Sequence, residues 1–252
     1  MKPSRWLALL VCVLPVAGVR SAEPPQQKAP SRYETRKEHD PNGTGKFYMG
    51  REIAQVMGHQ GAGWLERPQR EQEEQPGKLH KLLKIKPGEV VADIGAGSGY
   101  HTFRLSRLVG PKGKVYAVDI QPEMLAIMRQ RARQLKVANV ELIQGTESDP
   151  KLPANAVDLI LMVDVYHEFS RPYEMTEAML KALKPGGRLV FVEFRMEDPK
   201  VPILLVHKMT QKQVLKEMEP FPLRHVGTLN DLPWQHVIVF EKKKDAEGPR
   251  PK

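Results

Sequence analysis

The sequence predicts an α/β fold with a doubly wound sheet of seven mostly parallel strands and helices on both faces. Short apolar runs alternate with amphipathic segments over most of the chain, as strands and helices do in such folds. The run 157–163 is strongly apolar, which is typical of a strand buried on both faces of a parallel sheet. Another apolar run ends in a glycine-rich turn followed by a helical pattern, and α/β folds hold nucleotide-like ligands at such units.

The glycine-rich turn predicts a ligand with positive charge. It reads Asp-Ile-Gly-Ala-Gly-Ser-Gly-Tyr, with its glycines at Gly95, Gly97 and Gly99. Glycine permits positive φ angles there and lets backbone N–H groups approach a ligand that a Cβ atom would exclude. The dinucleotide-binding pattern requires its third glycine where this chain has Tyr100. Asp93, which precedes the first glycine, would repel a pyrophosphate and attract a cation.

The other elements are predicted from periodicity and boundary residues. Pro122 can begin a helix with one apolar face, and Thr210 with Gln213 indicates a capping box at another helix start. The stretch Leu-Lys-Pro-Gly-Gly from Leu183 ends a helix sharply, and the last two strands can form a hairpin. The expected strands are 89–94, 114–118, 140–144, 157–163, 188–194, 223–228 and 235–241, and the expected helices are 51–57, 78–84, 101–109, 122–135, 173–183 and one opening at Thr210.

The N-terminal part is predicted to contain a targeting segment and a linker. Residues 1–22 combine Lys2 and Arg5 with an apolar run and small residues near a cleavage site, the pattern of a secretory signal. We therefore expect an exported protein, periplasmic or secreted, or one anchored to the membrane if this segment is not cleaved. Residues 23–46 are rich in Pro, Gln and Lys and predict a disordered linker.

Residues 47–78 are expected to cover the ligand. Apolar residues alternate there with several glycines, and the segment has no core of its own. A lid that closes over the ligand and a purely structural cap are equally compatible with this pattern. The main domain is then residues 79–242, and residues 243–252 form a basic tail.

Composition limits the chemistry and the partners. The formal net charge is +9, but much of it lies in residues 1–22 and in the tail, so no nucleic-acid surface is expected. The single cysteine, Cys12, lies within the expected signal, which excludes cysteine-based catalysis in a mature chain. The histidines are scattered without an H-E-x-x-H pair, and no metal site is expected.

The motif from Asp93 to Gly99 resembles the first motif of class I S-adenosylmethionine-dependent methyltransferases, and the resemblance extends over residues 79–242. It includes Asp119 after the second strand and the Leu-Lys-Pro-Gly-Gly stretch before the fifth. S-adenosylmethionine carries ammonium and sulfonium groups, as a cationic ligand should. The resemblance implies a Rossmann-like sheet with the strand order three, two, one, four, five, seven, six, and S-adenosyl-L-methionine as the cofactor.

The resemblance also implies where cofactor and acceptor meet, because ligands of open α/β sheets bind beyond the carboxyl ends of the strands, where the strand order reverses. Methyl transfer is an in-line displacement that mainly requires positioning, and a base is needed only if the acceptor must lose a proton. His167 is the best-placed base, with Tyr166 or Glu168 as alternatives, although we favour a packed or hydrogen-bonded histidine at this position. The expected cofactor-binding residues are Asp93, Gly95, Gly97, Gly99, Asp119, Ile120, Thr146, Glu147 and Asp164.

We expect an enzyme that methylates a small-molecule or lipid-like acceptor, because no substrate-recognition domain is inserted. Export would separate the enzyme from a cofactor made in the cytoplasm. A non-catalytic exported binding module that kept the fold is therefore a competing prediction. A nicotinamide-dependent oxidoreductase is another, which Asp93 and Tyr100 disfavour.

Overall fold

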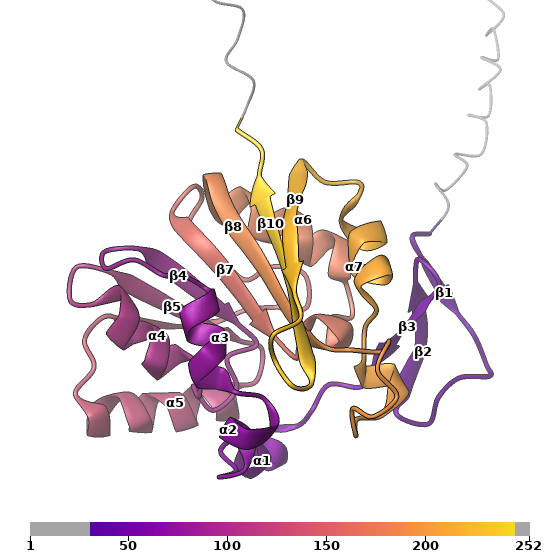
Figure 1. The fold of residues 1–252 in the computed structure, drawn as a ribbon, viewed down its shortest axis with the longest axis horizontal. Coiled ribbons are helices and arrows are strands. Elements are labelled where there is room, and N and C mark those ends of the chain that lie inside the picture. The colour runs from indigo at the N-terminus through magenta and orange to yellow at the C-terminus, as the bar shows by residue number, and fades with distance from the viewer. Residues whose placement is uncertain (1–30, 245–252) are drawn as a thin grey trace, which may run out of the picture. The chain divides into compact units, whose positions relative to one another are not determined.

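The main sheet has the strand order that the resemblance implied. The computed structural model describes residues 31–244, and those from Arg32 onward belong to one compact unit. Seven strands pair in the order β6-β5-β4-β7-β8-β10-β9, with helices packed on both faces (Figure 1). The strands are β4 (Val90–Ile94), β5 (Lys114–Asp119), β6 (Val140–Gln144), β7 (Val157–Val163), β8 (Leu183–Phe194), β9 (Leu223–Leu229) and β10 (Gln235–Lys242).

Side chains that alternate along the strands divide the core into two layers. The strands β4 to β8 pair in parallel, whereas β10 is antiparallel to both β8 and β9. On β7, Ile160 and Met162 pack into one layer with residues of α6 and α7, and Leu159 and Leu161 pack into the other with residues of α3 and α4. The helices are α3 (Pro76–Leu82), α4 (Thr102–Val109), α5 (Pro122–Leu135), α6 (Pro172–Ala182) and α7 (Gln211–Met218).

The connection between α6 and β8 differs from the prediction. We expected a helix over 173–183 and a strand that begins only at residue 188, but α6 ends at Ala182 and β8 begins directly after it, at Leu183. Gly186 has a φ of +76°, which favours glycine, and the pairing of β7 with β8 shifts register between Val157 and Leu159. The glycines therefore produce a bulged extension of the strand instead of a separate turn.

A three-stranded antiparallel sheet lies where the sequence predicted a linker and a helix. It consists of β1 (Tyr33–Thr35), β2 (Gly43–Tyr48) and β3 (Arg51–Ala54), in that order. The linker prediction is thus wrong from residue 33 onward, and the predicted helix 51–57 is wrong. Met49 and Gly50 both have positive φ, as a tight β-hairpin turn requires. Composition indicated a linker because these short strands carry many polar residues.

Buried polar contacts attach this N-terminal sheet to the main domain. The Arg51 guanidinium donates to both carboxylate oxygens of Glu217 on α7, at 2.8 and 3.1 Å, and to the backbone oxygen of His167 at 3.0 Å. Lys216 donates to the backbone oxygen of Met49 at 2.6 Å. Figure 1 shows the sheet beside α7. No local pattern predicts these contacts, because the partners lie far apart in the sequence.

The expected signal, the first part of the linker and most of the basic tail lie outside the described residues, so these predictions stay predictions. Within residues 31–244, no helix has both the length and the apolar character needed to cross a bilayer.

Candidate active site

A cavity of about 570 Å³ lies at the carboxyl ends of β4 and β7, where the strand order reverses. The cavity is lined by residues that follow the neighbouring strands β6, β5, β4, β7 and β8 of the sheet. Given the usual spacing of paired strands, it therefore extends across roughly 19 Å. Of the predicted site residues, Asp93, Gly99 and Tyr166 are not part of its lining. Those that line it are Gly95, Gly97, Asp119, Ile120, Thr146, Glu147, Asp164 and His167.

The glycine loop uses its N–H groups to hold its own shape. The Gly95 N–H donates to the Val118 carbonyl at 2.9 Å, and the Gly97 N–H donates to the Asp119 carboxylate at 2.8 Å. The expectation that N–H groups of this loop approach a ligand is therefore wrong at these two positions. The loop is tied to the end of β5, and this tie places Asp119 beside it.

The glycines are required by close packing as well as by positive φ. A Cβ atom on Gly95 would lie 2.3 Å from the Val165 side chain, and one on Gly97 would lie 2.7 Å from the Leu65 side chain. At Gly99 it would collide with α4. The loop is therefore packed between the segment after β7 and the N-terminal segment, and its surface facing the cavity has no side chains at Gly95 and Gly97.

Asp119 is buried and held in a fixed orientation at the end of β5. One carboxylate oxygen accepts from the Gly97 N–H, and the other accepts from the Gln121 N–H at 2.9 Å. Burial raises the pKa of this carboxyl. Each carboxylate oxygen has a second lone pair, so Asp119 can accept two further hydrogen bonds from a ligand in the cavity.

Asp93 faces away from the cavity, contrary to the expectation that it would face a cationic ligand. Its carboxylate accepts from the Thr102 hydroxyl at 2.6 Å, and only 3% of the residue is exposed. Burial raises the pKa of Asp93 to about 6. Because Thr102 is the first residue of α4, Asp93 ties the end of β4 to the start of the helix, where a carboxylate is favourable.

The charged groups in the cavity lining are mostly acidic. They comprise one arginine, Arg70, and the carboxylates of Asp119, Glu147, Asp164 and Glu168. Within the described chain, Oδ1 of Asp164 is buried without a hydrogen-bond partner, while Oδ2 accepts from Gln235 at 3.2 Å. Burial raises the pKa of Asp164 well above its ordinary value. This cavity therefore suits a ligand that carries both a cationic hydrogen-bond donor, which the carboxylates can bind, and an anionic group, which Arg70 can bind.

The loops after β5 and β6 supply one end of the cavity. Ile120 presents an apolar side chain that is 38% exposed. The Thr146 hydroxyl accepts from the Asp149 N–H at 3.0 Å and so holds the loop that carries Glu147. These residues can flank a flat ring, in agreement with their predicted place among the cofactor-binding residues.

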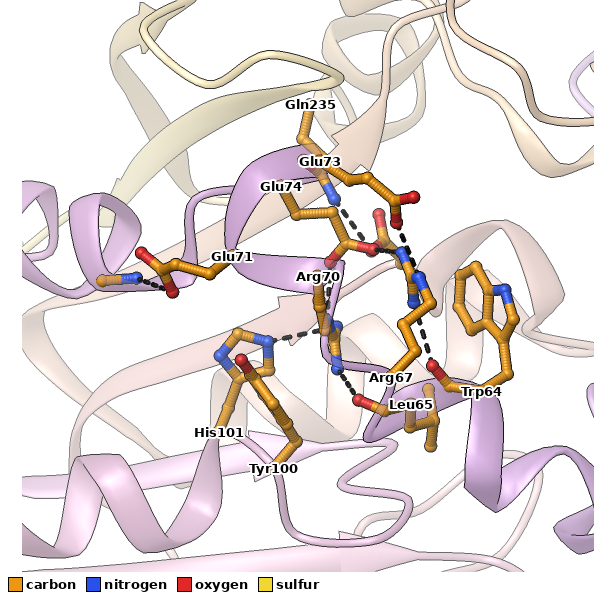
Figure 2. Close-up of polar contacts among 12 residues, drawn as sticks. Trp64, Leu65, Arg67, Arg70, Glu71, Glu73, Glu74, Tyr100, His101 and Gln235 are labelled. Atoms are coloured by element: carbon orange, nitrogen blue, oxygen red, sulfur yellow. Dashed lines mark hydrogen bonds and ion pairs between the residues drawn. The ribbon is translucent and has the colours of Figure 1, made fainter.

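The segment 47–78, predicted to be a lid or a structural cap, lines one side of the cavity. It contains η1 (His59–Gly61), α1 (Ala62–Leu65) and α2 (Arg70–Glu73), and Leu65 and Arg70 line the cavity. Figure 2 shows Arg70 between its partners: it donates to Glu74 at 2.7 Å and to the Leu65 oxygen at 2.9 Å, and it lies 3.3 Å from His101. Arg67 also pairs with Glu74 and lies over the Trp64 ring. Ion pairs, and not an apolar core of its own, therefore stabilise this segment.

His167 lies in η2 (Tyr166–Glu168) and pairs with a buried acid. Its Nδ1 lies 2.6 Å from Oε2 of Glu193, a β8 residue with no exposed surface, and its Nε2 lies 3.2 Å from Nδ1 of His207. Burial lowers and Glu193 raises the pKa of His167, and the net shift is upward. Tyr166 is instead fully buried and packs on Phe191, so its proposed catalytic role is not compatible with its position.

Sequence reasoning missed three residues of this site: Arg70, Glu193 and His207. Arg70 and His207 come from segments without a motif. Glu193 left a detectable signal, because an acid within the apolar run of a central strand is rare and is normally paired. The expectation of no metal site also overlooked that Glu168 and His207 lie beside His167.

Together, the fold and the cavity define an α/β enzyme with a site for a cationic, nucleoside-type cofactor. The sequence model of a family described as a methyltransferase domain matches residues 85–245, and the chain belongs to this family. The protein is a class I S-adenosylmethionine-dependent methyltransferase, and S-adenosylmethionine is its methyl donor.

Comparisons with individual proteins agree with this family assignment. The chain is 36% identical over 127 residues to the ubiquinone/menaquinone biosynthesis C-methyltransferase UbiE of Azotobacter vinelandii, which covers 47% of this chain and 50% of that protein. The chain spans about half the length of the curated relatives it matches.

Solved structures show the same fold. A methyltransferase dependent on S-adenosylmethionine from Aquifex aeolicus matches with a TM-score of 0.70 and 27% identity, covering 74% of this chain and 100% of that chain. A putative type 11 methyltransferase from Sulfolobus solfataricus matches with a TM-score of 0.57 and 22% identity, covering 71% of this chain and 97% of that chain. The second likeness shows the fold alone.

Proposed function

We propose that this protein transfers the methyl group of S-adenosylmethionine to a carbon atom of a small apolar acceptor of the phenol or quinol type. The observation that carries the proposal is the cavity, which has carboxylates at the end of β5 and in the segments after β6 and β7, and apolar side chains with two histidines in the segments after β7 and β8. The curated relatives are named as C-methyltransferases of ubiquinone and menaquinone biosynthesis, which supports an acceptor of this kind.

At the donor end, the ribose, the ammonium group and the carboxylate of the cofactor would each have a complementary partner. We propose that Asp119 accepts hydrogen bonds from the ribose hydroxyls and that the unpaired Oδ1 of Asp164 accepts from the ammonium group. Arg70 retains N–H groups beyond those that bind Glu74, Leu65 and His101, and these would bind the carboxylate. Ile120, Thr146 and Glu147 would flank the adenine. Asp93 and Gly99 would act indirectly, by shaping the loop.

At the acceptor end, apolar side chains form the walls. The walls come from the last residue of β8 and from the segments after β7 and β8, and consist of Phe169, Phe194, Pro202, Ile203 and Leu204. Such walls favour a flat, apolar ring over a charged or peptide acceptor. The polar groups at this end belong to η2 and η3 (Leu205–His207), which would orient an acceptor hydroxyl.

The reaction breaks the bond between sulfur and the methyl carbon, and the electron pair stays on sulfur. A new carbon–carbon bond forms, and the acceptor loses one proton. A phenol or quinol becomes a carbon nucleophile when its hydroxyl is deprotonated. We propose His167 as the base: Glu193 holds Nδ1 and would stabilise the imidazolium, which leaves Nε2 to accept the proton.

Calorimetric titration of the full chain with S-adenosylmethionine and S-adenosylhomocysteine tests the donor site. Asp119→Ala removes two charged hydrogen bonds of about 1.5–3 kcal/mol each, so affinity should fall about 100-fold or more. Asp231→Ala, which removes an exposed acid outside the cavity, should bind like the wild type. Equal affinities of the Asp119→Ala variant and the wild type would contradict the assignment.

Turnover tests the acceptor. The full chain is incubated with S-adenosylmethionine and a short-chain quinol, and mass spectrometry follows S-adenosylhomocysteine and the methylated product. We expect a product methylated on carbon. A product methylated on oxygen would contradict transfer to carbon, and no product when cofactor binding is saturated would contradict the proposed acceptor class.

A further inference from the structure

We propose that His167, Glu168 and His207 bind a divalent transition-metal ion of the zinc type at the acceptor end of the cavity. The three side chains come from η2 and η3, which are distant in sequence. Each offers one ligand atom, and within residues 31–244 these atoms form the one group of at least three such side chains that lie within 4.8 Å of one another. This inference goes beyond the proposed methyl transfer, because ion binding can be measured without turnover.

The separations of the ligand atoms match a single coordinated ion. His167 Nε2 lies 3.2 Å from His207 Nδ1 and 4.0 Å from Glu168 Oε1, and His207 Nδ1 lies 3.8 Å from Glu168 Oε1. The point equidistant from these three atoms lies about 2.1 Å from each, which is the usual length of bonds from zinc to histidine nitrogen and carboxylate oxygen. An ion in the plane of the three atoms can therefore reach all of them at bonding distance.

The surroundings prepare His167 to be a ligand. Glu193 accepts from Nδ1 of His167 and so directs the lone pair of Nε2 toward His207 and Glu168. Metal-binding histidines almost always have such a partner on the other ring nitrogen, because it fixes the ring orientation and makes the ligand more basic. The other oxygen of Glu193 accepts from the Tyr166 N–H at 2.9 Å, so Glu193 is itself held rigidly.

The charge balance at the cluster favours a cation. Glu168 and Glu193 bring two carboxylates into a mostly buried position, where an uncompensated negative charge is unfavourable. Arg51 donates to the His167 backbone oxygen, but its charge is paired with Glu217. Two histidines with one carboxylate are a donor set of zinc and iron(II) sites, whereas Mg²⁺ prefers oxygen ligands alone.

The site opens to the cavity, because all three ligands line it. Three protein ligands with an open position are typical of catalytic zinc sites. If the proposed function is right, the acceptor hydroxyl would occupy the open position, and the ion would lower the pKa of that hydroxyl. With the ion bound, the Nε2 lone pair is used for coordination and the ion would promote loss of the acceptor proton, so the role of His167 as base applies to the metal-free protein.

The test measures metal binding on the full chain after treatment with a chelator. Cobalt(II) serves as the probe, because its visible absorption reports four- or five-coordinate binding, and zinc should displace it. We expect one equivalent to bind. His207→Ala should weaken binding at least 100-fold, and Glu193→Gln should weaken it about 10- to 100-fold, as loss of such a partner usually does. His225→Ala, which removes an exposed histidine outside the cavity, is the matched control.

Two results would overturn the site: absence of stoichiometric cobalt or zinc binding by the wild type, or equal binding by the wild type and the His207→Ala variant. His207 lies on the surface side of the cluster, with 23% of its side chain exposed, so this variant should fold. If Glu193→Gln does not fold, Glu168→Gln provides a second, independent test, because loss of this ligand should also weaken metal binding. Titration with S-adenosylmethionine on the same samples separates the proposals, because cofactor binding without metal binding rejects only the metal site.

Discussion

Asp93→Asn is expected to remove a pH dependence of stability that the wild type shows. The Asp93 carboxyl is buried, accepts from the Thr102 hydroxyl, and has its pKa raised from 3.8 to about 6 by burial. The folded state therefore binds the proton more tightly than the unfolded chain. The resulting stabilisation is complete below pH 3.8 and is lost as the pH rises to about 6. At about 1.4 kcal/mol per pKa unit, its full size is about 3 kcal/mol.

Urea unfolding of both proteins between pH 4 and pH 7 measures this effect. Asparagine keeps an oxygen that can accept from Thr102 but carries no charge. The free energy of unfolding of the wild type, relative to that of Asp93→Asn, should therefore fall by about 2.5 kcal/mol over this range. Asp231→Asn, an exposed control, should follow the wild type. Parallel pH profiles for the wild type and Asp93→Asn would refute the reasoning.

The remaining predictions concern the glycine loop, the N-terminal sheet and maturation. Gly97→Ala should lower the free energy of unfolding by about 1–2 kcal/mol, because φ is +56° and the new Cβ would lie 2.7 Å from Leu65. Unchanged stability of Gly97→Ala in urea unfolding would contradict this prediction. Glu217→Ala should lower the same quantity by about 3–5 kcal/mol, because it leaves Arg51 buried and unpaired. Replacing both partners by apolar residues should recover most of that loss, and a double variant as unstable as Glu217→Ala would argue against it. If residues 1–22 are a cleaved export signal, N-terminal sequencing of the mature protein should begin near residue 23, whereas an intact N-terminus would contradict cleavage.

Local signals were sufficient to predict most of the main domain. The strands 140–144 and 157–163 have the predicted bounds, because apolar runs between turn residues are local features. The Thr210 hydroxyl caps α7 by accepting from the Gln213 N–H at 3.0 Å, as its position predicted. The other half of the capping box is absent from the observed hydrogen bonds, because the Gln213 side chain donates to Glu217.

The N-terminal sheet shows where local signals fail. The strands β1 to β3 are short and carry many polar residues, so their composition resembles that of a linker. Their pairing with one another, and the contact of Arg51 with Glu217, stabilise them as strands. A sequence pattern indicates the secondary-structure propensity of a segment, but it does not show the tertiary contacts that can override this propensity.

The sequence by itself determined the succession of strands and helices along the main domain and the glycine loop, because these depend on spacing within short stretches. The order of the strands within the sheet and the methyltransferase class were implied by the resemblance of its motifs to a known family. Only the tertiary structure decided which side chains face the cavity. It turned Asp93 toward α4, buried Tyr166, and brought Glu193 and His207 to His167 from later segments of the chain. Such contacts depend on which strand ends lie side by side in the folded sheet, and no local spacing records that arrangement.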